Sequence, residues 1–374
     1  MTTASTLLPS ASGQNRSESI AWVRQRLVSH RQPSGHTELS ADLQRSWERC
    51  LQRGWNPDDR VLCNPVSTSQ VAQLLEQNRP LLKAAEPVVR SLARTMQHTG
   101  YFALLTDAMG RVIDVQGPAD PIHPQVAAIA RVGVDLSEDA VGTTAIGTAL
   151  AEQHPVWLHQ GEHFFEDTTV FTCAGAPIVG PDRRCVGMLD LTGIHVREQP
   201  ALKFLVAQAA SQIENALTLA HPHQLLLRIS WPGSVPGTEA DGLVCIDGNG
   251  YITGCNRAAA YMLTLTPACL PRKAEDVFAC KADALFDAAR EHRAPMQLPL
   301  WSGLLVQVMA QPGAPLGHTT RSAGTASGSA TVALKDVETA MIRRAVDDAQ
   351  GSVSQAARAL GISRATLYRK LAKH

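Results

Sequence analysis

The stretch GSVSQAARALGISRATLYRKLAKH, residues 351–374, carries five basic residues and no acidic one, in a chain of 374 residues with a formal net charge of zero. Its pattern predicts two short helices around a tight turn. Ser352 and Gln355 form a capping-box pair at the start of the first helix. Gly361 supplies a left-handed residue at the turn, and Ser363 caps the second helix. This is the arrangement of a helix-turn-helix, which places a recognition helix in the major groove of DNA. The alternative is an amphipathic hairpin with a solvated basic face.

The second helix of this segment presents polar and basic side chains outward, away from an apolar seam that faces the first helix. Because side chains on that outer face reach base edges or phosphates in helix-turn-helix proteins, we expect seven residues to contact DNA. Contacts to bases or phosphates are expected from Arg364, Thr366, Tyr368 and Arg369, and contacts to backbone phosphates from Ser352, Ser363 and Lys370.

The string GSVSQAARALGISRATLYRKL resembles the Fis-type helix-turn-helix at the end of bacterial enhancer-binding activators. In that family an upstream helix forms part of a dimer interface, and residues 334–349 supply apolar positions spaced three and four apart for such a helix. The resemblance implies a homodimer that binds an inverted repeat in double-stranded operator DNA. Its half-sites would lie about one helical turn apart.

Composition indicates a globular protein of two or three domains, with 44% hydrophobic and 18% charged residues. No apolar run approaches the 18 or so residues of a membrane span, so we expect none. Residues 1–19 are polar and lack the apolar core of a signal peptide, so we expect an unstructured lead-in and a cytoplasmic protein. The eight cysteines form no CxxC pair, and the 13 histidines show no zinc-site spacing. We therefore expect no disulfide framework, no metal site and no cofactor.

The segments before residue 221 predict helices followed by a sheet. Helical periodicity marks residues 20–99 as a helical region. From Tyr101 the pattern alternates, and strands are expected at 101–107, 111–117, 155–159, 175–179 and 185–191. Together they predict an antiparallel sheet flanked by helices over residues 100–220. The domain-closing helix carries a seam spaced alternately four and three apart, which also favours pairing with a twin helix: Leu202, Val206, Ala209, Ile213, Ala216 and Ala220.

A smaller α+β module is expected at residues 238–310. The string LVCID, a DGNG turn and a following helix resemble the opening of a PAS domain. Residues 311–331 are rich in Pro, Gly, Ser and Thr, a composition typical of a flexible linker. The predicted fold class is therefore α+β multidomain, ending in an all-α helix-turn-helix domain at 332–374.

Five strings between residues 45 and 193 together resemble the sensory half of the acetoin-catabolism activator family. They are RSWERC (45–50), VGTTAIGTAL (141–150), GEHF (161–164), FTCAGAPI (171–178) and GMLDLTG (187–193). In that family these strings belong to a GAF domain that binds a small effector, so the resemblance implies a GAF domain over residues 100–220. One departure is Thr144, where the family often has asparagine.

Six residues in or near these strings are candidates for an effector pocket, because apolar walls with a few polar groups are typical of small-molecule sites. The aromatic candidates are Trp157, Phe164 and Phe171, and the polar candidates are Thr144, His163 and Cys173. The alternative, that these side chains stabilise the packing of sheet and helices and touch no ligand, stays open at this point.

Activators that work with sigma-54 polymerase carry a central ATPase with a GxxxxGK[ST] phosphate loop and a GAFTGA loop. Neither string occurs in this chain, so we expect a transcription regulator that senses an effector without hydrolysing ATP and has no catalytic residues. RNA polymerase is a further candidate partner. Two alternatives stay open: an accessory protein that pairs with an ATPase-bearing activator, and a small-molecule-binding or redox enzyme that uses Cys173.

Overall fold

The computed structural model describes residues 18, 20–21, 23–25, 39–61, 66–119, 122–291 and 294–313. The chain divides into two compact units, residues 1–316 and residues 317–374. All of the described residues belong to the first unit. The expected linker, the helix-turn-helix and its seven DNA-contacting residues lie outside the described residues. Within the described ranges, no helix is both long enough and apolar enough to cross a lipid bilayer.

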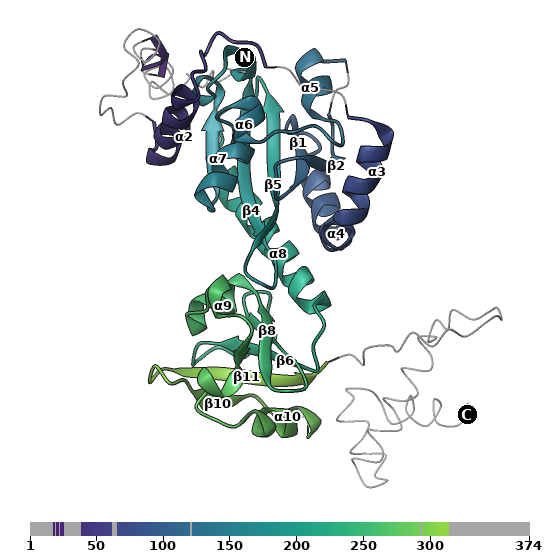
Figure 1. Ribbon diagram of the computed structural model, residues 1–374, viewed down its shortest axis with the longest axis vertical. Coiled ribbons are helices and arrows are strands. Elements are labelled where there is room, and N and C mark those ends of the chain that lie inside the picture. Colours follow the sequence, from purple (N-terminus) through teal and green to yellow (C-terminus); the bar gives the residue numbers. More distant parts are fainter. Residues whose placement is uncertain are drawn as a thin grey trace, which may run out of the picture. The chain divides into compact units, whose positions relative to one another are not determined.

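The first sheet has five antiparallel strands in the order β2-β1-β5-β4-β3 (Figure 1). This confirms the expected antiparallel sheet flanked by helices, including the hairpin of its first two strands. The strands are β1 (Tyr101–Asp107), β2 (Val112–Gln116), β3 (Val156–His159), β4 (Phe171–Val179) and β5 (Cys185–Ile194). The helices around it are α2 (Ala41–Gln52), α3 (Thr68–Gln77), α4 (Arg79–Thr95), α5 (Pro124–Ile129), α6 (Glu138–Val141), α7 (Ala145–Glu152) and α8 (Leu202–Ala220).

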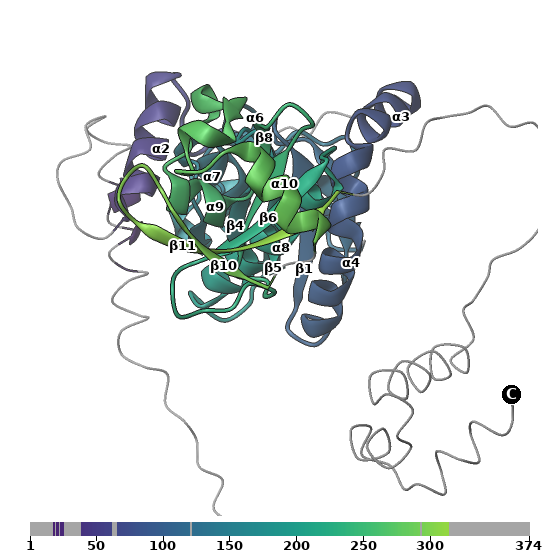
Figure 2. The same cartoon turned by 90° about the horizontal axis from the view of Figure 1, so that it is seen from below.

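Side chains alternate across the first sheet and give it two buried faces. On β1, Ala103 and Leu105 pack in the core formed with α4 and α8, while Phe102 and Leu104 belong to the core on the opposite face. Figure 2 shows α4 and α2 on opposite sides of the sheet. Because both faces are covered, a polar side chain on a central strand of this sheet is enclosed by protein.

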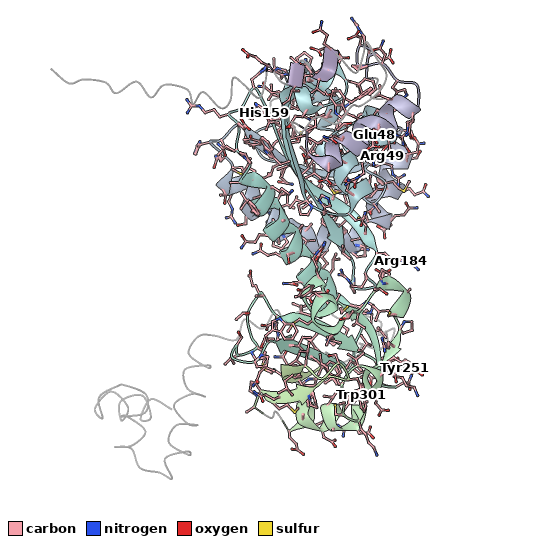
Figure 3. The ribbon with its side chains drawn as sticks, turned by 90° about the vertical axis from the view of Figure 1, so that its left-hand side faces the viewer. Glu48, Arg49, His159, Arg184, Tyr251 and Trp301 are labelled. Carbon is pink, nitrogen blue, oxygen red and sulfur yellow. The ribbon has the colours of Figure 1, made fainter. Side chains whose placement is uncertain are left out.

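The motif RSWERC attaches α2 to the face of the sheet that carries α6 and α7. Arg49, labelled in Figure 3, pairs with Glu138 through two bonds of 2.6 and 2.8 Å, and Ser46 donates to the same carboxylate at 2.7 Å. The Trp47 indole donates to the Glu162 carbonyl at 2.9 Å. Burial opposes ionisation of Glu138, but the bonds from Arg49 and Ser46 outweigh it and lower its pKa. The motif is thus a structural clamp.

The seam on α8 is occupied within its own domain. Leu202, Val206, Ala209 and Ile213 are buried against the sheet, in the same core as α4. Helix α8 therefore lies against the first sheet as the last helix of this domain, and these four positions are covered within the chain, where the seam was expected to face a twin helix as well. The physical reason is that one face of the sheet offers α8 an apolar surface, which the periodicity of the helix alone does not reveal.

The second sheet has six antiparallel strands in the order β10-β11-β6-β7-β8-β9. The strands are β6 (Leu225–Ser230), β7 (Gly242–Ile246), β8 (Tyr251–Cys255), β9 (Arg272–Lys273), β10 (Met296–Pro299) and β11 (Leu305–Pro312), and the helices are α9 (Arg257–Leu263) and α10 (Ala282–Arg290). Strand β6 lies inside the sheet and precedes residue 238, where this module was expected to begin. Its run LLLRIS is almost continuously buried and lacks the alternation that reveals a strand.

Polar contacts join α8 to the second sheet. Glu214, fully buried on α8, accepts the Val179 backbone N–H at 2.9 Å and the Arg257 guanidinium at 2.6 Å. One residue further along α8, Asn215 accepts a bond of 2.7 Å from Asn256. The carboxylate of Glu214 thus contacts the end of β4 in the first sheet and the start of α9 beside the second.

Candidate functional site

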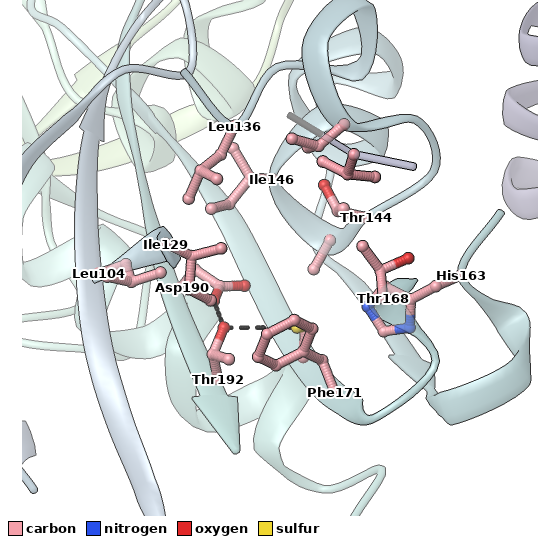
Figure 4. Close-up of a pocket in the computed structure, with 14 residues that line it drawn as sticks. Leu104, Ile129, Leu136, Thr144, Ile146, His163, Thr168, Phe171, Asp190 and Thr192 are labelled. Atoms are coloured by element: carbon pink, nitrogen blue, oxygen red, sulfur yellow. Dashed lines mark hydrogen bonds between the residues drawn. The ribbon is translucent and has the colours of Figure 1, made fainter. Parts of the chain in front are cut away.

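A cavity of about 40 Å³ lies between the first sheet and the helices that cover its α7 face (Figure 4). The volume is enough for roughly three water molecules or a compact organic molecule of a few heavy atoms. The sheet contributes Leu104, Phe171, Cys173, Asp190 and Thr192, the helices contribute Ile129, Val141, Thr144, Ala145 and Ile146, and the loops contribute Val61, Leu136, His163 and Thr168. Most of the wall is apolar, so each polar atom in it has a large effect on what can bind.

The alternation of β5 places two polar side chains in the cavity wall. In GMLDLTG, Leu189 and Leu191 pack toward α4 and α8, while Asp190 and Thr192 line the cavity on the opposite face. Neither of these polar residues is among the candidates predicted from the sequence, although the string belongs to the motifs that carry the resemblance. The usable signal was an acidic residue between two leucines on a strand buried on both faces.

Asp190 is fully buried, and its two carboxyl oxygens are in different situations. Oδ2 accepts a hydrogen bond of 2.5 Å from the Thr192 hydroxyl, whereas Oδ1 has no hydrogen-bond partner among the described residues. Burial raises the pKa of Asp190 to about 7, against the opposing effect of the bond from Thr192. Burial therefore makes this carboxyl group much easier to protonate near neutral pH than an exposed aspartate.

His163 brings a neutral imidazole to the cavity. Its Nδ1 lies 2.9 Å from the Gln160 carbonyl oxygen. Because a carbonyl can only accept, we assign the ring proton to Nδ1, which leaves Nε2 as an acceptor. In the part of the chain that the structure describes, no group donates to Nε2. Burial lowers the pKa of His163 to about 4, so the ring is uncharged at neutral pH.

The loop that carries His163 is held from outside by the N-terminal segment. Arg24 donates to the His163 carbonyl at 2.5 Å and to the Glu166 carboxylate at 2.8 Å. Its guanidinium also lies over the ring of Trp47, 5.5 Å from the centroid. These contacts fix the backbone of the loop and leave the imidazole of His163 to face the cavity.

Cys173 lines the cavity as a protonated thiol. Its Sγ lies 3.3 Å from the Thr192 hydroxyl. Burial raises its pKa well above the ordinary value, and the nearby charge of Asp190 acts in the same direction. A nucleophilic or redox-active cysteine needs a stabilised thiolate, so this environment does not support the alternative of an enzyme that uses Cys173.

Thr144 has a local structural role as well as a place in the cavity wall. As N-cap of α7 it accepts the Gly147 backbone N–H at 3.1 Å. A Cβ atom at Gly147 would lie only 2.7 Å from the backbone nitrogen of Glu138, so this position needs glycine for α6 and α7 to pack. Residues of the string VGTTAIGTAL therefore form the helical wall of the cavity, where Thr144 caps α7 and Gly147 allows α6 and α7 to pack closely.

The structure places four of the six expected pocket residues at the cavity: Thr144, His163, Phe171 and Cys173. Phe164 lies beside it in the core, with ring centroids 5.5 Å from Trp47 and 5.0 Å from Phe165. Trp157 belongs to the core on the other face of the sheet, and its ring stacks on that of His159 with the ring centroids 6.0 Å apart. These two residues do not line this cavity, because sequence proximity to the other candidates does not indicate which face of a strand or loop a side chain occupies.

An acidic cluster on the surface of the same domain has an explanation without a metal ion. Asp42, Glu152 and His154 have ligand atoms within 4.8 Å of one another. However, Arg45 pairs with both carboxylates, and Arg49 pairs with Glu152 at 2.9 Å. The negative charge of the cluster is thus already compensated by arginine.

Two protein-family models match separate parts of the chain. Residues 30–215 match the model described as MimR, N-terminal domain, and residues 333–374 match the model described as bacterial regulatory protein, Fis family. The acetoin catabolism regulatory protein of Cupriavidus necator is 30% identical over 229 residues, covering 60% of this chain and 34% of that protein. The propane 2-monooxygenase operon transcriptional activator MimR of Mycolicibacterium smegmatis is 31% identical over 200 residues, 49% of this chain and 34% of that one.

A signal-transduction and transcriptional-control protein of Clostridium beijerinckii is 26% identical over 247 residues, covering 66% of this chain and 38% of that protein. The chain thus spans little more than a third of the length of these curated relatives. Among solved structures, the E. coli DhaR(N)–DhaL complex aligns with a TM-score of 0.45 at 14% identity, covering 73% of this chain and 100% of that one.

The two resemblances drawn from the motifs are confirmed by these matches, and the three relatives are named for the control of transcription, not for catalysis. Residues 30–215 of this chain belong to the MimR N-terminal-domain family and residues 333–374 to the Fis family of bacterial regulatory proteins, which places the chain among the relatives of acetoin-type transcriptional activators.

Proposed function

We propose that the chain is a transcription regulator that binds a small uncharged effector in the cavity of its first sheet. It would bind operator DNA as a homodimer through residues 332–374 and would not hydrolyse ATP. The observation that carries the sensing role is a largely apolar cavity with two buried polar atoms, Asp190 Oδ1 and His163 Nε2, to which no described group makes a hydrogen bond. Buried polar atoms without a protein partner are costly, and a ligand that pairs with them removes the cost.

The cavity favours an uncharged effector over an anion. No lysine or arginine is among the described residues that line it, so a carboxylate or phosphate would have no counter-charge and would face Asp190. The relatives are consistent with this class, since one is named for acetoin catabolism and another for a propane 2-monooxygenase operon. Acetoin is a four-carbon hydroxyketone without charge.

Calorimetry tests the sensing role on the full chain. We expect acetoin, acetone or 2-propanol to bind with one site per chain, and lactate not to bind. The variant Ile146→Trp fills the cavity and should abolish binding, whereas Trp157→Phe, on the other face of the sheet, should leave it unchanged. Thermal unfolding of both variants verifies that they fold. Equal binding by wild type and Ile146→Trp would overturn this location of the site.

The DNA-binding role is supported by the Fis-family match over residues 333–374. We propose contacts from the seven residues named above, with Arg364 and Arg369 closest to guanine or phosphate. Selection of genomic fragments by the full chain should enrich a palindromic site, and deletion of residues 333–374 should remove the enrichment. Weak, salt-sensitive binding to every fragment would instead favour an accessory protein that pairs with an ATPase-bearing activator.

A further inference from the structure

We propose that Asp190 holds the effector as a neutral carboxylic acid, whose Oδ1–H donates to an oxygen atom of the effector, so that binding is coupled to one proton. This inference rests on the proposed sensing function and specifies its chemistry. It concerns one residue, Asp190, on the cavity face of β5.

The hydrogen bonds around Asp190 decide where its proton sits. Oδ2 already accepts from the Thr192 hydroxyl at 2.5 Å, and the Cys173 thiol, 3.3 Å from that hydroxyl, can donate to its oxygen in turn. The acid proton therefore belongs on Oδ1. Since Oδ1 has no partner among the described residues, protonated Asp190 presents one donor to the cavity.

The surroundings of Asp190 favour the acid over the carboxylate. The titratable groups that line the cavity with it are Cys173 from β4, a protonated thiol, and His163 from the covering loop, a neutral imidazole. Leu104 from β1 and Ala145 from α7 contribute apolar side chains to the wall of the cavity. With no cation among these neighbours, burial raises the pKa of Asp190 to about 7.

The opposite wall supplies the complementary acceptor. His163 Nε2 is free to accept a hydrogen bond from a hydroxyl group. One donor and one acceptor in an apolar cavity select an uncharged molecule that carries a carbonyl or hydroxyl oxygen. A carboxylate would instead lose its hydration without gaining a counter-charge.

The proton linkage has a definite sign. An effector that binds only the protonated form raises the pKa of Asp190 further, so its affinity is constant below the pKa of the free protein. Above about pH 7, affinity should fall by up to tenfold for each pH unit. His163 stays neutral through this range, because its pKa is about 4.

The experiment measures acetoin binding to the full chain by calorimetry between pH 5.5 and 8.5, with acetone and 2-propanol as further probes. Wild type should lose affinity above about pH 7. Asp190→Asn keeps a donor and cannot ionise, so its affinity should not change with pH. Asp190→Leu removes the donor and should bind weakly at every pH, and Trp157→Phe should behave as wild type.

Each outcome has one meaning. Binding by wild type with a flat pH profile would contradict the acid donor and leave the sensing function standing. Failure of all three probes to bind would contradict both. A ligand-free measurement adds a check: the carboxyl carbon of Asp190, identified in the NMR spectrum by its absence in Asp190→Asn, should titrate near pH 7. A carboxyl already ionised at pH 5.5 would overturn the proposal.

Discussion

Asp190 and His163 line the same cavity, and burial disfavours the charged form of both side chains. Their effects on stability have opposite signs. The pKa of Asp190 is raised from 3.8 to about 7, so its contribution is complete below pH 3.8 and is lost as pH rises through 7. The pKa of His163 is lowered from 6.5 to about 4, so its contribution is complete above pH 6.5 and is lost as pH falls through 4.

Between about pH 4 and 6.5 the two contributions should therefore largely cancel in wild type. At about 1.4 kcal/mol per pH unit, each is worth about 3–4 kcal/mol over its full range. We predict that Asp190→Asn loses stability as pH falls from 6.5 to 4.5, and that His163→Gln gains it. Urea unfolding at pH 4.5, 5.5 and 6.5 measures this, and parallel profiles for the two variants would contradict the assignment.

Cysteine reactivity is a second prediction about single residues. Burial raises the pKa of Cys173, whereas a hydrogen bond from Thr266 lowers the pKa of the partly exposed Cys269. Among the cysteines that the structure describes, iodoacetamide at pH 7.5 should modify Cys269 first in the native protein, and Cys173 should react only after unfolding. Peptide mapping by mass spectrometry reads the order. Rapid native labelling of Cys173 would revive a redox interpretation.

Helices and strands show what periodicity can and cannot indicate. The first hairpin and β4–β5 were predictable because their alternation and turn residues are local signals. The surface against which the apolar seam of α8 packs was not predictable, since a stripe of apolar residues fits a partner helix and a sheet face equally well. The cavity was half predictable: His163 and Cys173 stand in recognisable strings, but Asp190 becomes visible only when two covered faces are assigned to β5.

The clamp between α2 and α6 gives a prediction at this scale. Removing the Arg49 side chain leaves the largely buried Glu138 with less compensation, because Arg53 contacts it at only 3.3 Å. Arg49→Ala should destabilise the first domain by about 2–4 kcal/mol. Arg49→Lys should recover only part of this, because lysine cannot make the two-bond contact.

Arg90→Ala is the matched control for this variant. Arg90 pairs with Glu86 on the exposed surface of α4, and such pairs are worth less than about 1 kcal/mol. Urea unfolding followed by tryptophan fluorescence, with Trp47 in the clamp as reporter, compares the variants. Equal losses for Arg49→Ala and Arg90→Ala would show that the clamp adds little.

For the described chain as a whole, Glu214 is one of the residues that connect the two sheets through polar contacts. It binds the Val179 N–H at the end of β4 and the Arg257 guanidinium at the start of α9. We predict that Arg257→Ala, which leaves Glu214 buried without its cation, speeds hydrogen exchange at Val179 and across β7 and β8. Arg290→Ala, at an exposed pair with Asp287, is the control and should leave those rates unchanged.

Strand β4 has one end at the cavity and the other end beside the second sheet's module. Phe171 and Cys173 line the cavity, whereas Val179, roughly 20–26 Å away along an extended strand, donates its backbone N–H to Glu214. In such an arrangement, the residues at one end of β4 can be substituted while the contact at its other end is retained. If the cavity is the effector site that we propose, substitutions at 171–173 would change which compound is recognised, while the connection at Val179 would stay the same.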